Sequence, residues 1–268
     1  MRFKLILSVN KEVFGNLLPI NYQYEQSATI YKILSRASKE YSEWLHKNGY
    51  QIEGGKKFKL FTFSPLKIEK RKILTDSERI AILCDKVEWQ ISFFPEKSTE
   101  KFIQSLLNNQ FFEIGDKKSV VQFHIQHIEL LPPPLITELM TFNTMSPICI
   151  RQKRENGTTE YLSPDDPRSK EAILSGLLSR YESFYGRPYH KSVDFRFVPF
   201  GNIKKKLVTI KTGTASQTRV VGYKCKFNMQ APVELMQIAY ESGVGEECAQ
   251  GFGCVRELKS EGKRNIKL

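Results

Sequence analysis

Four histidines are the side chains best suited to move protons near neutral pH in this sequence: His46, His124, His127 and His190. Imidazole titrates close to neutrality, so it can serve as a general acid or a general base. His46 stands just before Asn48-Gly49, a pair typical of a helix C-terminus. The helix dipole at that end favours the positively charged imidazole, which suits a general acid. A solvent-exposed histidine at a helix end would account for the same position without any chemistry.

The other reactive residue types give no metal or disulfide pattern. His124 and His127 lie three residues apart on an expected strand, so their side chains should point to opposite faces of the sheet. The five cysteines are odd in number, scattered and without a CxxC pair, which argues against a disulfide framework and a zinc site. No group of Asp, Glu and His has the spacing of metal ligands. We therefore expect neither a metal ion nor another cofactor.

The segment from Gly243 to Gly253 has four glycines in eleven residues and lies between an expected helix and the final strand. Glycine permits positive φ and lets a backbone approach another chain closely. The segment is not a dinucleotide loop, because that motif follows a strand and opens a helix, and no Gly-Lys-Ser/Thr follows to make a P-loop. A tight surface connection and a loop that approaches a partner both remain open.

Positive charge is concentrated in three runs. The chain carries a net charge of +12 with a pI of about 9.4, which attracts polyanions such as nucleic acid or an anionic membrane. One run is usually only a solvated face. Three such runs, together with a glycine-rich loop, favour a surface that binds successive phosphates of a nucleic acid backbone. The runs are Lys67, Lys70, Arg71 and Lys72; Arg151, Lys153 and Arg154; and Lys204, Lys205, Lys206, Lys211 and Arg219.

The first half of the chain follows the order strand, helix, strand, strand, helix, strand. Apolar residues recur at helical spacing across residues 24–47, and Pro95 opens a second helix. Alternating apolar residues predict the strands, at residues 2–9, 57–64, 87–93 and 119–131.

The second half repeats that order after the run Pro132-Pro133-Pro134, which divides the chain into domains of residues 1–131 and 135–268. Asp166 before Pro167 predicts the start of one helix, and Pro232 opens another. Strands are expected over residues 137–151, 191–199, 205–212, 218–230 and 251–258. Two βαββαβ units predict an α+β protein of two tandem ferredoxin-like domains, a topology shared by RNA-recognition modules and by many unrelated proteins.

The segment GVGEECAQGFGCV resembles the C-terminal glycine-rich signature of the repeat-associated RNA-binding superfamily of CRISPR systems. Within that superfamily the chain is similar to the sixth Cas family, whose members are endoribonucleases that cut CRISPR repeat transcripts. Other matches to the family's pattern follow in the right order across nearly the whole chain. They are MRFKLIL at the N-terminus, Asn21-Tyr22-Gln23-Tyr24, Lys59-Leu60-Phe61-Thr62-Phe63-Ser64 and Ser146-Pro147-Ile148.

The resemblance implies cleavage without a metal ion, in which the 2′-hydroxyl attacks the neighbouring phosphate and leaves a 2′,3′-cyclic phosphate and a 5′-hydroxyl. Such a reaction needs a base, an acid and a cation that stabilises the phosphorane. By resemblance the catalytic residues are His46, Tyr31 and Lys59, although Lys56 and Lys57 leave the exact lysine open.

Tyr31 and His46 could share one site only if their helix breaks. Fifteen residues separate them, about 22 Å in a straight helix at ~1.5 Å per residue. Ser38 offers a break, since it can act as a new N-cap with Glu40 in the first turn. The alternative for Tyr31 is a core aromatic residue at helical spacing.

The resemblance also implies partners. We expect CRISPR repeat RNA, as precursor and as processed guide RNA, and subunits of an interference complex that receives the product. The residues expected to contact RNA are Lys204, Lys205, Lys206, Lys211, Arg219, Gly243, Gly245, Gly251 and Gly253.

We expect a cytoplasmic monomer or homodimer without a membrane partner. No run of about 18 apolar residues occurs, and the apolar run at the N-terminus is too short for a signal peptide. A catalytically silent repeat-RNA-binding protein or structural subunit of such a complex is the chief alternative. A basic DNA-binding regulator is a weaker one, because no helix-turn-helix pattern occurs.

Overall fold

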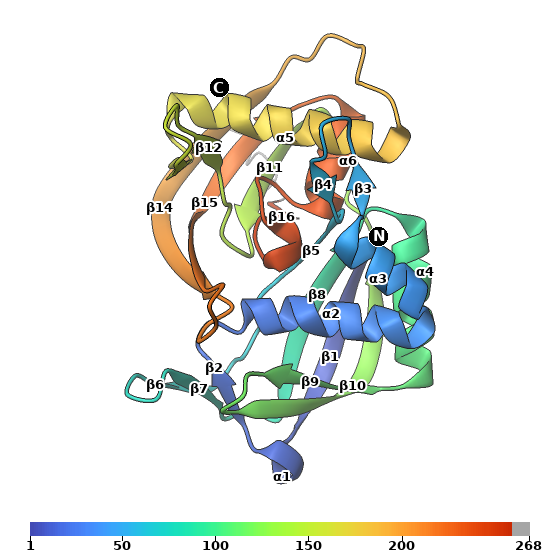
Figure 1. Cartoon of the computed structure of the whole chain (residues 1–268), viewed down its shortest axis with the longest axis vertical. Helices are drawn as coiled ribbons and strands as arrows, with labels where there is room; N and C mark the ends of the chain where they lie inside the picture. The colour runs from blue at the N-terminus through green and yellow to red at the C-terminus, as the bar shows by residue number, and fades with distance from the viewer. Residues whose placement is uncertain (259–268) are drawn as a thin grey trace, which may run out of the picture.

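A computed structural model of the chain describes residues 1–258, which form two main sheets with helices packed on them and three smaller sheets of two or three strands (Figure 1). The first domain contains β1 (Arg2–Asn10), α1 (Lys11–Phe14), β2 (Leu17–Pro19), α2 (Gln23–Ala37), α3 (Lys39–Lys47), β3 (Tyr50–Gln51), β4 (Lys57–Phe58), β5 (Phe61–Phe63), β6 (Arg71–Leu74), β7 (Arg79–Ile82), β8 (Lys86–Phe93), α4 (Glu96–Asn108), β9 (Phe111–Gly115) and β10 (Val120–Leu131).

The helices and strands of the second sheet all follow the three prolines. It contains β11 (Leu139–Thr144), β12 (Arg151–Lys153), β13 (Thr159–Tyr161), α5 (Pro167–Tyr185), β14 (Arg196–Ile210), β15 (Thr218–Gln230), α6 (Val233–Ser242), the 3₁₀ turn η1 (Cys248–Gln250) and β16 (Val255–Glu257). The last ten residues of the expected second domain, 259–268, lie outside the described residues.

Both sheets have the ferredoxin-like strand order. The first sheet runs β5-β8-β1-β10-β9 and the second runs β14-β15-β11-β16, with antiparallel pairing throughout. In each domain the first strand lies between the third and the fourth, and β9 is an addition at one edge of the first sheet. The prediction of two tandem ferredoxin-like domains is therefore confirmed.

The cores follow the alternation read from the sequence. Trp89, Ile91 and Phe93 of β8 are fully buried against α2 and α4, which cover one face of the first sheet. In the second domain Phe227 and Met229 of β15 pack with α5 and α6 in a separate core. In Figure 1, α2 crosses the front of the first sheet, α5 crosses the second, and η1 lies between the two helices.

The expected helix over residues 24–47 is two helices. α2 ends at Ala37, and Ser38 takes an extended conformation in which its side chain accepts a hydrogen bond from the backbone N–H of Tyr41. This is the N-cap arrangement expected at Ser38, because the hydroxyl satisfies a donor that has no partner within the helix.

Several strand predictions need correction. The strand expected over residues 57–64 is divided into β4 and β5, because Leu60 takes a left-handed backbone with a φ of 53°. The strand expected at 137–151 stops at Thr144, and the last strand begins at Val255 rather than 251. The two strands expected at 191–199 and 205–212 are one long strand, β14, with an irregularity between Phe200 and Lys204.

Among the described residues, none of the helices is long and apolar enough to cross a membrane.

Candidate active site

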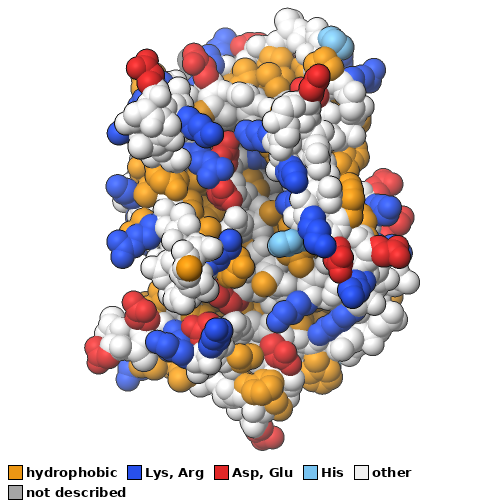
Figure 2. Space-filling view, in the orientation of Figure 1, with side chains coloured by type: hydrophobic (Ala, Val, Ile, Leu, Met, Phe, Trp, Pro, Cys, Tyr) orange, Lys and Arg blue, Asp and Glu red, His pale blue; other side chains and the backbone are white. Residues whose placement is uncertain are grey.

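A cleft of about 420 Å³ lies between the two domains. Figure 2 shows this hollow in the middle of the molecular face, with Lys and Arg side chains around its rim and acidic side chains in its wall. The first domain contributes residues of α2, α3 and the β4–β5 segment, and the second contributes residues of α5 and of the loop after α6. All three residues predicted to be catalytic, Tyr31, His46 and Lys59, line this one cleft.

The break at Ser38 brings Tyr31 and His46 together. The centroids of their two rings are 5.0 Å apart, with the ring planes at 87°. Tyr31 also packs edge-on against the buried ring of Phe61, with the centroids 5.7 Å apart. Burial raises the pKa of the Tyr31 hydroxyl above its ordinary value of 10.0, so that hydroxyl stays neutral at physiological pH. His46 is exposed on the last turn of α3.

Lys59 lies beneath the end of α3. Its Nζ donates hydrogen bonds to the carbonyl oxygens of Leu45 at 2.5 Å and His46 at 2.7 Å. Carbonyl groups at a helix C-terminus lack partners within the helix and carry the negative end of its dipole, so a cation stabilises them. An ammonium group has three N–H donors, so one remains available. Burial, with a smaller effect from the charge of Lys57, lowers the pKa of Lys59 from 10.5 to about 8.

The glycine-rich loop packs against protein on both sides. Side chains of the first domain donate hydrogen bonds to three backbone carbonyl oxygens of the loop. The pairs are Ser27 with Ala249 at 2.7 Å, Gln23 with Gly251 at 2.8 Å and Thr62 with Phe252 at 2.9 Å. From the second domain, the buried guanidinium of Arg180 donates to the carbonyl oxygens of Gly243 and Gly245.

All four glycines predicted to contact RNA are buried in this arrangement. A Cβ at Gly253 would lie 2.1 Å from the carbonyl oxygen of Val244, and one at Gly245 would lie 2.4 Å from that of Cys149. Their observed contacts are therefore to protein. The loop residues that reach the cleft are instead Glu246, Glu247, Cys248, Ala249 and Gln250.

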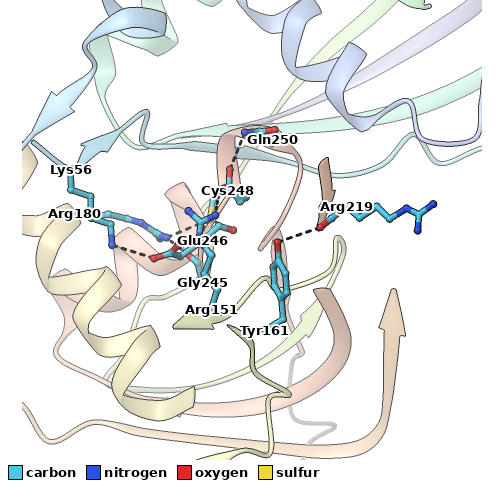
Figure 3. A network of polar contacts seen from close by, with 10 residues as sticks. Lys56, Arg151, Tyr161, Arg180, Arg219, Gly245, Glu246, Cys248 and Gln250 are labelled. Carbon is cyan, nitrogen blue, oxygen red and sulfur yellow. Dashed lines mark hydrogen bonds and ion pairs between the residues drawn. The ribbon is translucent and has the colours of Figure 1, made fainter. Parts of the chain in front are cut away.

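Two carboxylates of this loop bind cations in the cleft, and one of these ion pairs reaches the first domain (Figure 3). Glu246 forms an ion pair with Arg151, and its other oxygen lies 3.2 Å from Nζ of Lys56 in the first domain. Arg151 also contacts Glu247 at 2.8 Å. Burial would raise the pKa of Glu246, but the charges of Arg151 and Lys56 outweigh it and lower that pKa. The network links β12, the glycine-rich loop and the segment before β4.

Two family models match this chain in tandem. One describes the N-terminal part of the CRISPR-associated protein Cas6 and matches residues 17–127; the other describes its C-terminal part and matches residues 131–257. The chain belongs to the Cas6 family.

The similarity between this Cas6 family member and its curated relatives extends over nearly the whole length of each sequence. A CRISPR-associated endoribonuclease Cas6 1 of Methanocaldococcus jannaschii is 29% identical over 271 residues, covering 100% of this chain and 97% of the relative. A CRISPR-associated endoribonuclease Cas6 of Pyrococcus furiosus is 26% identical and covers 100% and 92%. The solved structure of a Cas6-related gene product from Pyrococcus furiosus has a TM-score of 0.79 at 25% identity, with 97% and 99% covered.

The hairpin formed by β14 and β15 places neighbouring lysines of the sequence on opposite faces. On β14 Lys204 lies opposite Lys224 of β15, and Lys206 lies opposite Gly222, so Lys204 and Lys206 share a face with Lys224. Lys205 points to the other face because side chains alternate along a strand. Lys211 lines the cleft. In Figure 3 the side chain of Arg219 extends away from the ion-pair network, while its carbonyl accepts from Tyr161 at 3.4 Å.

The other histidines lie outside the cleft. A β-bulge in β10 shifts the register between Ile6 and Leu7 of β1, so His127 faces Ile6 and His124 faces Ser8. The two histidines therefore share the outer face, contrary to the prediction that they point to opposite faces. Within residues 1–258 no group of three or more His, Cys, Asp and Glu side chains could hold a metal ion. His190 lies in the segment before β14, not at the start of a strand.

The sequence interpretation missed Arg180 and Glu246. Arg180 occupies the apolar stripe of α5, three residues after the buried Leu177, and a charged residue on such a stripe was the available signal. Glu246 stands inside the glycine-rich segment, where the interpretation considered only the glycines.

We predict that Gly251→Ala will destabilise the protein more than Gly157→Ala. Both glycines have positive φ, at +88° and +77°, so both variants carry the same kind of backbone strain. Only at Gly251 would the new Cβ meet packed atoms, with Cε2 of Phe63 at 2.8 Å, whereas nothing lies within 4 Å at Gly157. Thermal unfolding should show a lower Tm for Gly251→Ala, by roughly 2–4 °C per kcal/mol lost. Equal Tm values would mean that the loop does not depend on this contact.

Proposed function

We propose that this Cas6 family member is an endoribonuclease that binds CRISPR repeat RNA and cuts the precursor transcript into guide RNAs without a metal ion. The observation that carries the proposal is the convergence of Tyr31, His46 and Lys59 on one cleft, from α2, α3 and the β4–β5 segment. The relatives named as CRISPR-associated endoribonucleases support the reaction class. The guide RNA would then pass to an interference complex.

The cleft supplies groups for cleavage by the RNA's own 2′-hydroxyl. In this mechanism the 2′-oxygen forms a bond to phosphorus, the bond from phosphorus to the 5′-oxygen breaks, and the products carry a 2′,3′-cyclic phosphate and a 5′-hydroxyl. His46 donates its proton to the departing 5′-oxygen as general acid. Water in the open cleft takes the proton of the 2′-hydroxyl.

Tyr31 and Lys59 have supporting roles in this mechanism. Because its raised pKa keeps the Tyr31 hydroxyl neutral, this group positions the 2′-hydroxyl or a phosphate oxygen by hydrogen bonding rather than acting as a phenolate base. Lys59 places a positive charge beside the same carbonyl groups that end α3, where it stabilises the crowded phosphorane and also fixes the turn that carries His46.

A catalytically silent RNA-binding protein is the second candidate, since binding alone needs only the basic surface. The presence of a histidine beside Tyr31 in the cleft favours the enzyme. Incubating the protein with the repeat RNA of its own CRISPR array separates the two candidates, because only the enzyme yields discrete products.

Cleavage is expected to proceed in excess EDTA, because the mechanism uses only side chains and the 2′-hydroxyl. A 2′-deoxy nucleotide immediately upstream of the cut should abolish cleavage and leave the affinity nearly unchanged, since it removes the nucleophile but no phosphate. Denaturing gels and filter binding measure the two effects. Loss of cleavage in EDTA that a divalent ion restores would rule out this mechanism.

Replacing His46 should separate chemistry from binding. A proton-transfer group contributes about 10²–10⁴-fold in rate, so His46→Ala should slow single-turnover cleavage by roughly that factor. The variant loses at most one phosphate contact, so its affinity for repeat RNA should change less than about tenfold. His127→Ala, on the outer face of the first sheet, is the control and should cleave at the wild-type rate. Wild-type cleavage by His46→Ala would place the site elsewhere.

The lowered pKa of Lys59 predicts how cleavage depends on pH. Lysine loses its charge as pH rises through its pKa, so cleavage at subsaturating RNA, which reports the free protein, should decline above a pH of about 8. At saturating RNA the decline should move to higher pH, because a bound phosphate stabilises the ammonium form. Lys59→Arg keeps its charge across this range and leaves the His46 acid in place, so the wild-type rate divided by the Lys59→Arg rate should fall as pH rises through about 8. A ratio that stays constant with pH would mean that Lys59 does not control the decline.

A further inference from the structure

The carboxylate of Glu246 is an unexpected group in a cleft proposed to bind RNA. Its two oxygens contact different cations, Arg151 of the second domain and, at 3.2 Å, Lys56 of the first (Figure 3). Both cations line the cleft together with Tyr31 and His46. Burial opposes ionisation of Glu246, but the charges of the two cations outweigh it and lower the pKa, so the carboxylate is charged at neutral pH. A strand that reaches His46 therefore meets ion pairs that already join the two domains.

The contacts of Glu246 are those that a phosphate would make. A phosphodiester also presents two charged oxygens from one centre, and arginine and lysine bind phosphates and carboxylates through the same N–H donors. Glu246 thus lies between Lys56 and Arg151 where one phosphate of an RNA backbone would fit. The two carboxylates of this network, Glu246 and Glu247, balance its two cations. The network as a whole therefore offers an entering phosphate no net attraction while Glu246 stays in place.

The side chain of Glu246 can leave these cations while the loop keeps its conformation. The backbone N–H of Glu246 donates to the carbonyl oxygen of Cys149 at 2.7 Å, which anchors the main chain. Arg151 keeps its other contact, at 2.8 Å, with Glu247, whose carboxylate accepts a hydrogen bond from Gln250 at 2.9 Å. The side chain of Glu246 is 24% exposed, so a released carboxylate reaches water. Entry of a phosphate therefore requires the displacement of one side chain only.

We propose that Glu246 is an internal competitor of RNA. Its carboxylate occupies a phosphate position of the cleft in the free protein, and a bound strand displaces it from Lys56 and Arg151. This inference rests on the proposed function, because it takes the bound polyanion to be RNA. The competitor lowers the affinity of the cleft for a backbone phosphate, and it holds a cation of each domain in place until a strand arrives.

Glu246→Gln tests the proposal, because it removes the charge and keeps the shape of the side chain. Affinity is measured with a labelled RNA copy of the organism's own CRISPR repeat, made uncleavable by a 2′-deoxy nucleotide at the cut. At about 0.1 M salt the variant should bind this RNA roughly fivefold more tightly than the wild type, the size expected from ion pairs that are partly exposed. The gain should shrink as salt rises to about 1 M, because salt screens both the ion pairs and the phosphate contacts.

Glu160→Gln is the matched control. The side chain of Glu160 is 26% exposed and also contacts two cations, Arg154 at 3.3 Å and Arg168 at 3.1 Å, but it does not line the cleft. The control removes the same charge and releases two cations elsewhere, so its affinity should stay near the wild-type value. An equal gain in both variants would mean that Glu246 acts only through the net charge of the protein, and would overturn the proposal.

A purely structural ion pair predicts a different result. If Glu246 served only to join the domains, Glu246→Gln would lower the Tm and leave the affinity for RNA unchanged or reduced, and either affinity result would overturn the proposal. In a protein that already carries Lys56→Gln and Arg151→Gln, the same substitution should raise the affinity much less, because the cations it would release are absent; an undiminished gain would also overturn the proposal. Failure of the endoribonuclease proposal would appear separately, as wild-type protein that binds the RNA but does not cut it.

Discussion

The cleft exists because side chains of the first domain bind backbone carbonyl groups of the second. Hydroxyl and amide groups from α2 and β5 donate to three carbonyl oxygens in a span of four residues, 249–252. A buried carbonyl must have a donor, so these bonds fix the distance and direction of one domain relative to the other. They require the loop backbone to lie directly against the first domain. Glycine is needed at Gly251 for that reason, since a Cβ there would overlap Phe63.

The same loop is held from its own side by Arg180. A buried guanidinium that donates to the carbonyls of Gly243 and Gly245 leaves the first part of the loop little freedom. Glu246 and Glu247 follow directly and are thereby presented to the cleft, where they meet Arg151 and Lys56. The glycines thus build the loop, and the residues between them carry its charge. In the free protein the glycines of this loop contact other protein atoms, and the residues between them line the cleft.

How far the sequence predicts this structure depends on whether a feature is local. The strand order follows from alternation and helical spacing, and the helix break follows from the capping ability of Ser38 and the acidic residue two positions later. The β-bulge in β10 and the left-handed backbone at Leu60 have no such local signal, because both depend on pairing with other strands. Only the resemblance to the family predicted that Tyr31, His46 and Lys59 would lie together in one site. The burial of Gly251 depends on how the domains dock, and the position of Arg180 depends on tertiary packing within the second domain; periodicity encodes neither.

Charge is distributed differently at the two candidate RNA contacts, the cleft and the hairpin. In the cleft Arg151 is already held by two carboxylates, so a phosphate there must compete with Glu246 and Glu247. This competition lowers the affinity for a phosphate, but the carboxylates hold the cation in a fixed orientation. A preoriented cation stabilises a transition state better than a mobile one. On the hairpin Lys204, Lys206 and Lys224 lie on one face, and none of them forms an ion pair within residues 1–258, so a phosphate there displaces no carboxylate partner. In the proposed function, the cleft would therefore bind the transition state of cleavage better than the intact RNA, because its cations are oriented before the strand binds.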